Sequence, residues 1–196
     1  MIKISIIAIC FSILFVMLAW FMLPKFLEQP KYKVVRKEND IEIRKYDKIL
    51  TSSVKVYGDQ YTSLRKGFQP LVRYIGAKER DSEKISMTAP VIQTTNDETE
   101  NWTVSFAMPS KYNIDNLPKP ENDDIYFEEM LPSLAAVIRF SGVADTSLLN
   151  KKASALKRWL ELNRYTELSS PKFLFYNDPT TPGFLRRNEV MIIIDK

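Results

Sequence analysis

Residues 134–164 read LAAVIRFSGVADTSLLNKKASALKRWLELNR, and this stretch joins a strand pattern directly to a helix pattern. The first seven residues form a short, mostly apolar run that predicts a β-strand. Residues 145–164 predict an amphipathic helix, because their apolar side chains recur with helical spacing on one face: Leu149, Ala153, Leu156 and Leu160. A strand followed by a helix with a single apolar face favours a fold in which helices pack on a sheet.

The same order occurs earlier in the chain. Ile49–Tyr57 is predicted as a strand, and a helix follows over residues 59–76, with Asp59 as its N-cap and Gly76 as its C-cap. Pro70 removes one backbone hydrogen bond of this helix and predicts a kink there. Apolar side chains lie on one face of this helix, because they follow the spacing i, i+3, i+7, i+10 and i+14: Tyr61, Leu64, Phe68, Leu71 and Ile75.

Further strands are expected on both sides of each helix, so the order strand-strand-helix-strand-strand occurs twice. A connector rich in Pro, Asn and Asp over residues 109–124 separates the two halves. We therefore predict an α+β fold: a distorted antiparallel β-barrel made from two such repeats, with two flanking helices and a ligand groove beside them. The other expected strands cover residues 32–38, 41–46, 84–93, 101–108, 125–130, 172–176 and 189–195.

The amino-terminal segment differs in character from the rest. Residues 2–23 are almost wholly apolar, with Lys3 as the only charge, and as a helix they would span about 33 Å, close to the hydrocarbon thickness of a bilayer. We predict one uncleaved transmembrane helix as an anchor over residues 1–24, a linker over 25–30 and one domain over 31–196. A cleaved signal peptide is the alternative, but no small-x-small site follows the apolar run.

The expected localisation is therefore a single-pass membrane protein that contacts the lipid bilayer through residues 2–23. Its orientation stays open, because two signals conflict. The positive charges that follow the span favour a cytoplasmic domain, whereas a short basic start before a long tail is typical of exported anchored domains. The positive residues after the span are Lys25, Lys31, Lys33, Arg36 and Lys37.

Composition excludes several classes of protein. The 196 residues include no His and one Cys, which rules out a Ser-His-Asp triad, a Cys-His dyad and any histidine-ligated metal. The net charge of +4 is too small to indicate a nucleic-acid partner. No motif supplies an evident catalytic acid, base or nucleophile, so we expect a binding protein rather than an enzyme.

Two segments are more specific than simple packing requires: KISMTAPV at residues 84–91 and FLRRNEV at residues 184–190. Together with residues 41–46, 108–112 and 117–120, they resemble the SOUL haem-binding protein family. The resemblance runs in the family's order through nearly the whole chain after the apolar segment. It implies a distorted antiparallel barrel made of two strand-helix repeats, and the binding of haem and other tetrapyrroles.

The resemblance also implies a site. In relatives the porphyrin lies in a shallow apolar groove along the first helix, and basic side chains meet its propionates. Here Arg65 and Arg73 match those basic positions, eight residues apart on one side of the helix, and arginine suits a carboxylate. Phe68, Leu71 and Val72 match apolar contacts. The alternatives are a solvated face for the two arginines and a core role for the three apolar residues.

Iron ligation is the open question, because some relatives use a histidine that this chain lacks. Tyr61, Tyr74 and Met87 are the candidates by position, and binding without any iron ligand is the other alternative. In that case a metal-free porphyrin is expected to bind nearly as well as haem. The expected function is a membrane-anchored haem or tetrapyrrole carrier, buffer or sensor; the alternative is a binding module for another amphipathic ligand or a protein.

Overall fold

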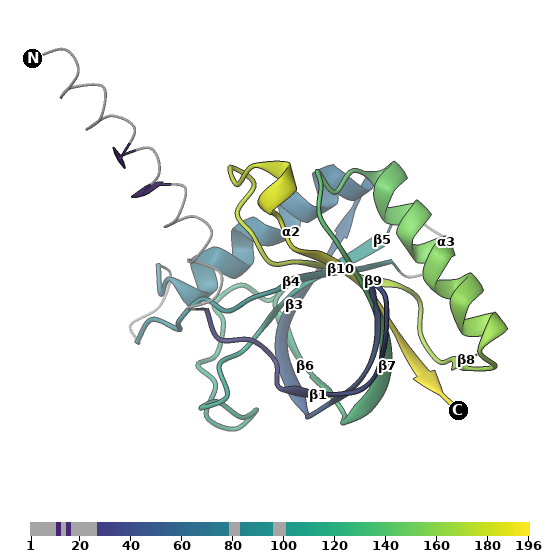
Figure 1. Ribbon diagram of the computed structural model, residues 1–196. Coiled ribbons are helices and arrows are strands. Elements are labelled where there is room, and N and C mark those ends of the chain that lie inside the picture. Colours follow the sequence, from purple (N-terminus) through teal and green to yellow (C-terminus); the bar gives the residue numbers. More distant parts are fainter. Residues whose placement is uncertain (1–10, 13–14, 17–26, 79–82, 96–100) are drawn as a thin grey trace, which may run out of the picture.

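The protein is described by a computed structural model that covers most of the chain (Figure 1). The described residues are 11–12, 15–16, 27–78, 83–95 and 101–196. Within these ranges, no helix is long and apolar enough to cross a membrane. The expected transmembrane helix lies almost wholly outside the described residues, so the anchor stays a prediction.

Ten strands form one antiparallel sheet that curls into a half-barrel (Figure 1). Their order across the sheet is β1-β2-β7-β10-β9-β4-β5-β3-β6, and the short β8 pairs with β10. No pairing joins the edge strands β1 and β6 in the part of the chain described, so the expected barrel is confirmed only as a curled, open sheet. The strands are β1 Tyr32–Glu38, β2 Ile41–Tyr46, β3 Ile49–Tyr57, β4 Val91–Thr95, β5 Asn101–Ala107, β6 Tyr126–Met130, β7 Ser133–Phe140, β8 Thr166–Glu167, β9 Lys172–Phe175 and β10 Asn188–Asp195.

Two helices lie against the outer face of the curled sheet, α2 over Gln60–Ile75 and α3 over Thr146–Leu162. Each begins at an aspartate whose side chain accepts a backbone N–H of the first turn: Asp59 from Thr62, and Asp145 from Leu148. These N–H groups have no partner inside a helix, and the aspartates satisfy them. A short 3₁₀ turn, η1 over Gly183–Leu185, precedes the last strand.

The strand expected over residues 84–93 is only partly correct. The pairing of β4 begins at Val91, after Pro90. Over the described residues 83–90, the bridge between Thr88 and Glu28 is isolated and belongs to no strand. Proline has no N–H to donate to a ladder, which explains why the strand begins after it. The predicted similarity of the two halves stays a prediction, because three strands precede α2, whereas two strands, β6 and β7, lie between the connector over residues 109–124 and α3.

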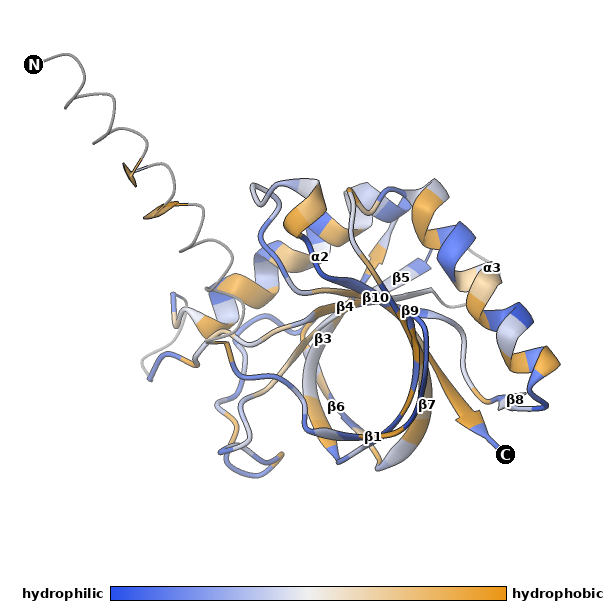
Figure 2. Cartoon of the chain, in the orientation of Figure 1, coloured by the Kyte–Doolittle hydropathy of each residue, from blue (hydrophilic) through white to orange (hydrophobic). Residues whose placement is uncertain are grey.

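The core consists of three groups of buried side chains, two under the helices and one inside the half-barrel. Alternation along β10 shows the division: Val190, Ile192 and Ile194 pack with α3, whereas Met191 belongs to the interior group. Along α3 itself, hydrophobic and hydrophilic bands alternate (Figure 2). The helices therefore cover only the outer face of the sheet, and the inner face has its own, separate set of contacts.

Candidate functional site

The first helix is held close to the sheet by a small residue. A Cβ atom added at Gly67 would lie 2.6 Å from the Val104 side chain, so only glycine permits this approach of α2 to β5. At the next residue, the ring of Phe68 packs edge-on against Phe106, with their centroids 5.3 Å apart. These contacts fix which side of α2 faces solvent.

The five residues expected to bind a ligand divide into three levels of burial. Arg65 and Arg73 are exposed, and Phe68 and Val72 are half-buried at the edge of the core. Leu71 has an exposed fraction of 0% and belongs to the core under α2. A ligand on the outer face cannot contact Leu71 without rearrangement of the helix, which favours the core interpretation for this residue. The other four form one continuous outer face.

The two arginines lie about 12 Å apart along the helix axis, from the rise per residue. The guanidinium carbon of Arg65 lies 6.0 Å from the centroid of the Tyr61 ring, within cation–π range. Two exposed guanidinium groups with apolar surface between them can pair with carboxylates of an amphipathic ligand. This outer face of α2, defined by Arg65, Phe68, Val72 and Arg73, is the candidate site.

The three candidate iron ligands differ in access. The Tyr61 side chain is open to solvent, with an exposed fraction of 67%. Tyr74 is 4% exposed, and its hydroxyl donates a hydrogen bond to the Pro118 carbonyl at 2.7 Å. Met87 is half-buried against the core. Within the described ranges, no group of three or more His, Cys, Asp or Glu side chains could hold a metal ion. Tyr61 is thus the accessible candidate.

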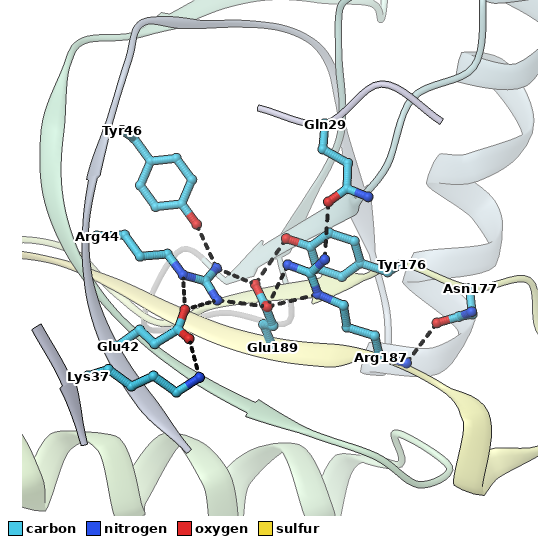
Figure 3. A network of polar contacts seen from close by, with 9 residues as sticks. All are labelled: Gln29, Lys37, Glu42, Arg44, Tyr46, Tyr176, Asn177, Arg187 and Glu189. Carbon is cyan, nitrogen blue, oxygen red and sulfur yellow. Dashed lines mark hydrogen bonds and ion pairs between the residues drawn. The ribbon is translucent and has the colours of Figure 1, made fainter. Parts of the chain in front are cut away.

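A second polar arrangement, not predicted from the sequence, lies inside the half-barrel (Figure 3). Arg44 on β2 and Glu189 on β10 form a two-pronged ion pair, with N–O distances of 2.8 and 3.0 Å. Their side chains are 1% and 0% exposed. Tyr176 donates its hydroxyl hydrogen to Glu189 at 3.0 Å, and Arg187 donates from Nε at 3.0 Å. The interior network is the set Glu42, Arg44, Tyr46, Tyr176, Arg187 and Glu189.

The ionisation of this network follows from its contacts. Burial alone would raise the pKa of Glu189, but hydrogen bonds and charge from Arg44 and Arg187 more than offset it and hold that pKa below 4.5. Burial raises the pKa of Tyr46 to about 12, against the opposing effect of Arg44. Glu189 is therefore a carboxylate and Tyr46 a neutral phenol at neutral pH. The buried charges are paired with one another, as a structural ion pair requires.

Contacts within the protein also explain much of the segment FLRRNEV at residues 184–190. Arg187 stacks on the ring of Tyr176, with its guanidinium carbon 3.7 Å from the centroid. Arg186 donates from Nε to the backbone carbonyl of Thr181 at 2.7 Å. These contacts are internal to the protein, so residues 186–189 hold the last loop and strand in place.

The expected linker also contacts the domain, at least from residue 27 onward. The Glu28 carbonyl accepts from the Ala89 N–H at 2.9 Å, and its carboxylate accepts from the Ser110 N–H at 2.7 Å. The Gln29 side-chain oxygen accepts from Arg187 Nη1 at 3.1 Å. Residues 27–30 are therefore fixed against the half-barrel rather than running free before it.

Comparison with known proteins gives one family and one fold. Residues 27–193 match the profile of the family described as SOUL heme-binding protein. No curated protein matches the chain in sequence. Among solved structures, the C-terminal domain of EcmrR has a TM-score of 0.61 at 14% identity, covering 84% of this chain and 98% of that one. A hydrolase from Listeria innocua has a TM-score of 0.56 at 9% identity, covering 82% and 94%. At these identities the two structures establish the fold alone.

Proposed function

Because the chain belongs to the SOUL heme-binding protein family, we propose that it binds haem or another tetrapyrrole on the outer face of α2. The observation that carries the proposal is the pairing of charge and apolar surface on that face. Exposed Arg65 and Arg73 flank the half-buried Phe68 and Val72. A porphyrin has an apolar ring and two propionates, so the face offers contacts of both kinds.

The residues present fit the porphyrin better than they fit its iron. The sequence has no histidine, and Tyr61 is the accessible candidate ligand, next to Arg65. Tyrosine is a known haem ligand. The proposal therefore rests on burial of the ring and pairing of the propionates, with Tyr61 as the residue that would hold iron. In this proposal the protein binds haem without catalysing a reaction and acts as a carrier, buffer or sensor.

Haem titration of the full-length protein tests the proposal. Binding should shift the Soret band in a saturable way at micromolar haem, against a blank that contains the same buffer and any detergent. The variant Tyr61→Phe should keep most of the affinity and change the ligand-field bands of ferric haem if Tyr61 holds the iron. No Soret shift at micromolar haem would refute haem binding and favour the alternative, a module for another amphipathic ligand or a protein.

Membrane anchoring through residues 2–23 is a separate part of the proposal, and it is supported by sequence alone. The segment carries a single charge, Lys3, and is long enough to cross a bilayer. Extraction of cell membranes with alkaline carbonate tests it: the full chain should stay in the pellet, and a chain lacking residues 2–23 should be released. Release of the full chain would contradict the anchor without bearing on tetrapyrrole binding.

A further inference from the structure

A polar row crosses the inner face of the half-barrel on the neighbouring strands β9, β4, β5 and β3 (Figure 1). In the pairing register, Lys172 on β9 lies opposite Thr94 on β4. Thr94 lies opposite Thr103 on β5, and Thr103 lies opposite Lys55 on β3. Leu174, two residues after Lys172, belongs to the interior group of the core, so the row faces inward. It therefore lies on the opposite face of the sheet from α2.

The first three members of this inner row are half-buried and still reachable from solvent. Lys172, Thr94 and Thr103 each keep partial exposure. Within the described ranges, their side chains make no hydrogen bond or ion pair, and their polar atoms are not sealed from solvent. Adjacent strands are about 5 Å apart. One ligand group can therefore reach an ammonium and two hydroxyls at once.

The ammonium of Lys172 is only partly compensated by charges of the protein. Burial lowers the pKa of Lys172, and the charge of Glu128 opposes this effect without cancelling it. Glu128 is an exposed residue of the edge strand β6, and in the part of the chain described it forms no ion pair with Lys172. Charges that are withdrawn from water are ordinarily paired in proteins. An anion from outside the chain would supply the partner that Lys172 lacks.

The surroundings of the inner row favour one negative charge on a ligand with an apolar part. Ile193 on β10, the strand next to β9, is half-buried on the same inner face. At the other end of the row lies a hollow of about 250 Å³ that is lined by Lys55, Tyr126 and Asp124. A volume of about 150 Å³ holds a benzene ring. Asp124 would repel a second anionic group there, so a monoanion fits better than a dianion.

We propose that Lys172, Thr94 and Thr103 bind the carboxylate of a small carboxylic acid whose apolar part lies along the inner face. The ammonium and the two hydroxyls can all donate to the two carboxylate oxygens, and the bonds from the ammonium are charge-assisted. This site shares no residue with the outer face of α2 or with the interior network. It therefore goes beyond the proposed function and does not depend on it.

Fluorine NMR of 4-fluorobenzoate with the full-length protein tests the need for a charge. The fluorine line should broaden at millimolar ligand, against a blank that contains the same buffer and any detergent. 4-Fluorobenzamide has nearly the same shape but no charge, and it should bind about tenfold or more weakly, because hydrogen bonds to charged groups are the stronger ones. Equal binding of the two compounds, or no binding of 4-fluorobenzoate, would overturn the proposal.

Substitution of the lysine locates the binding. Lys172→Met should weaken 4-fluorobenzoate about tenfold or more and leave the melting temperature equal or higher, because it removes a half-buried charge without a partner. The matched control is Lys45→Met, the same change at an exposed position of β2, which should leave binding unchanged. A marked loss of stability in Lys172→Met would show that its ammonium has a structural partner. Unchanged binding in that variant would place the acid elsewhere on the basic surface; both results contradict the proposal.

Two neighbouring threonines of β4 test which face of the sheet is used. Thr94→Val should weaken 4-fluorobenzoate about threefold, because it removes one hydroxyl donor. Thr95→Val makes the same change on the opposite face of the strand and should have no effect. Equal effects of the two variants would contradict binding on the inner face. Haem titration of the same variants should match the wild type, so failure of haem binding and failure of this site are read separately.

Discussion

Arginine has two different environments in this fold, one inside the half-barrel and one on the outer face of α2. Arg44 lies inside the half-barrel, 1% exposed, and both of its terminal nitrogens contact Glu189. Arg65 lies on the outer face of α2 and is exposed, near the ring of Tyr61. The buried arginine has its anion supplied by the protein, whereas the exposed one can meet an anion from a ligand. Burial, rather than residue type, separates the structural role from the binding role.

The largest effect is expected from breaking the interior pair. Arg44→Met leaves the Glu189 carboxylate buried without its main partner, and such a change costs about 3–5 kcal/mol of unfolding free energy. Urea denaturation measures the loss. The matched control is Arg65→Met, the same change on the outer face, which should cost less than about 0.5 kcal/mol. Similar losses in the two variants would remove the distinction between the two regions.

Acid pH tests the same pair without mutation of the arginine. The pKa of Glu189 is lowered in the folded state, so its contribution to stability is fully present above its ordinary pKa of about 4.5. That contribution is lost as the pH falls through the lower folded-state pKa, by about 1.4 kcal/mol for each unit of the shift. Unfolding free energy measured from pH 7 to pH 3 should fall more steeply in the wild type than in Glu189→Gln. Parallel curves would show that Glu189 is not linked to acid unfolding.

The outer face should respond in binding and not in stability. Arg65→Ala combined with Arg73→Ala should weaken haem about tenfold, because two exposed charge-assisted contacts are lost. The control is Lys151→Ala with Arg158→Ala, which removes the same charge from exposed positions of α3. Soret titrations at low and physiological salt compare the two. If both double variants bind haem equally, the net charge of the protein and not the α2 face attracts the propionates.

The smallest difference is expected between haem and its metal-free form. Without histidine in the chain, affinity comes mainly from ring burial and the two arginines, so protoporphyrin should bind within about tenfold of haem. Fluorescence quenching of the three tryptophans follows both ligands. A hundredfold preference for haem would show that a side chain ligates the iron strongly, and Tyr61→Phe would then be the variant to compare.

Local features of the fold were accessible from the sequence because they depend on nearby residues. The N-cap at Asp59 and the alternation along β10 each follow from spacing within one element. The apolar stripe predicted for the helix is only partly buried, because Leu71 and Ile75 lie in the core whereas Tyr61 is 67% exposed. The start of β4 was placed too early, because the strand-like alternation of apolar residues over 84–91 continues across Pro90, whereas the ladder cannot. Such patterns report which face is buried but not where pairing begins.

The interior network was not accessible in the same way. Arg44 and Glu189 are 145 positions apart in the chain, and nothing local marks either as buried. Their meeting depends on the placement of β7 between β2 and β10. For the candidate site, the motif resemblance selected α2, but only the packed structure separates Leu71, which is inaccessible, from Phe68 and Val72 beside it.

The hydrogen bonds of Glu28 and Gln29 to the half-barrel limit how far the domain can lie from a membrane anchor that precedes it. Both residues are hydrogen-bonded to the half-barrel. A flexible tether before the domain would therefore end at residue 27 and not at Tyr32, where the first strand begins. If residues 1–24 lie in a bilayer as we propose, three residues remain, and a fully extended chain of that length spans at most about 11 Å. The domain would then lie close to the lipid surface. A hydrophobic tetrapyrrole could pass between the membrane and the protein with little exposure to water.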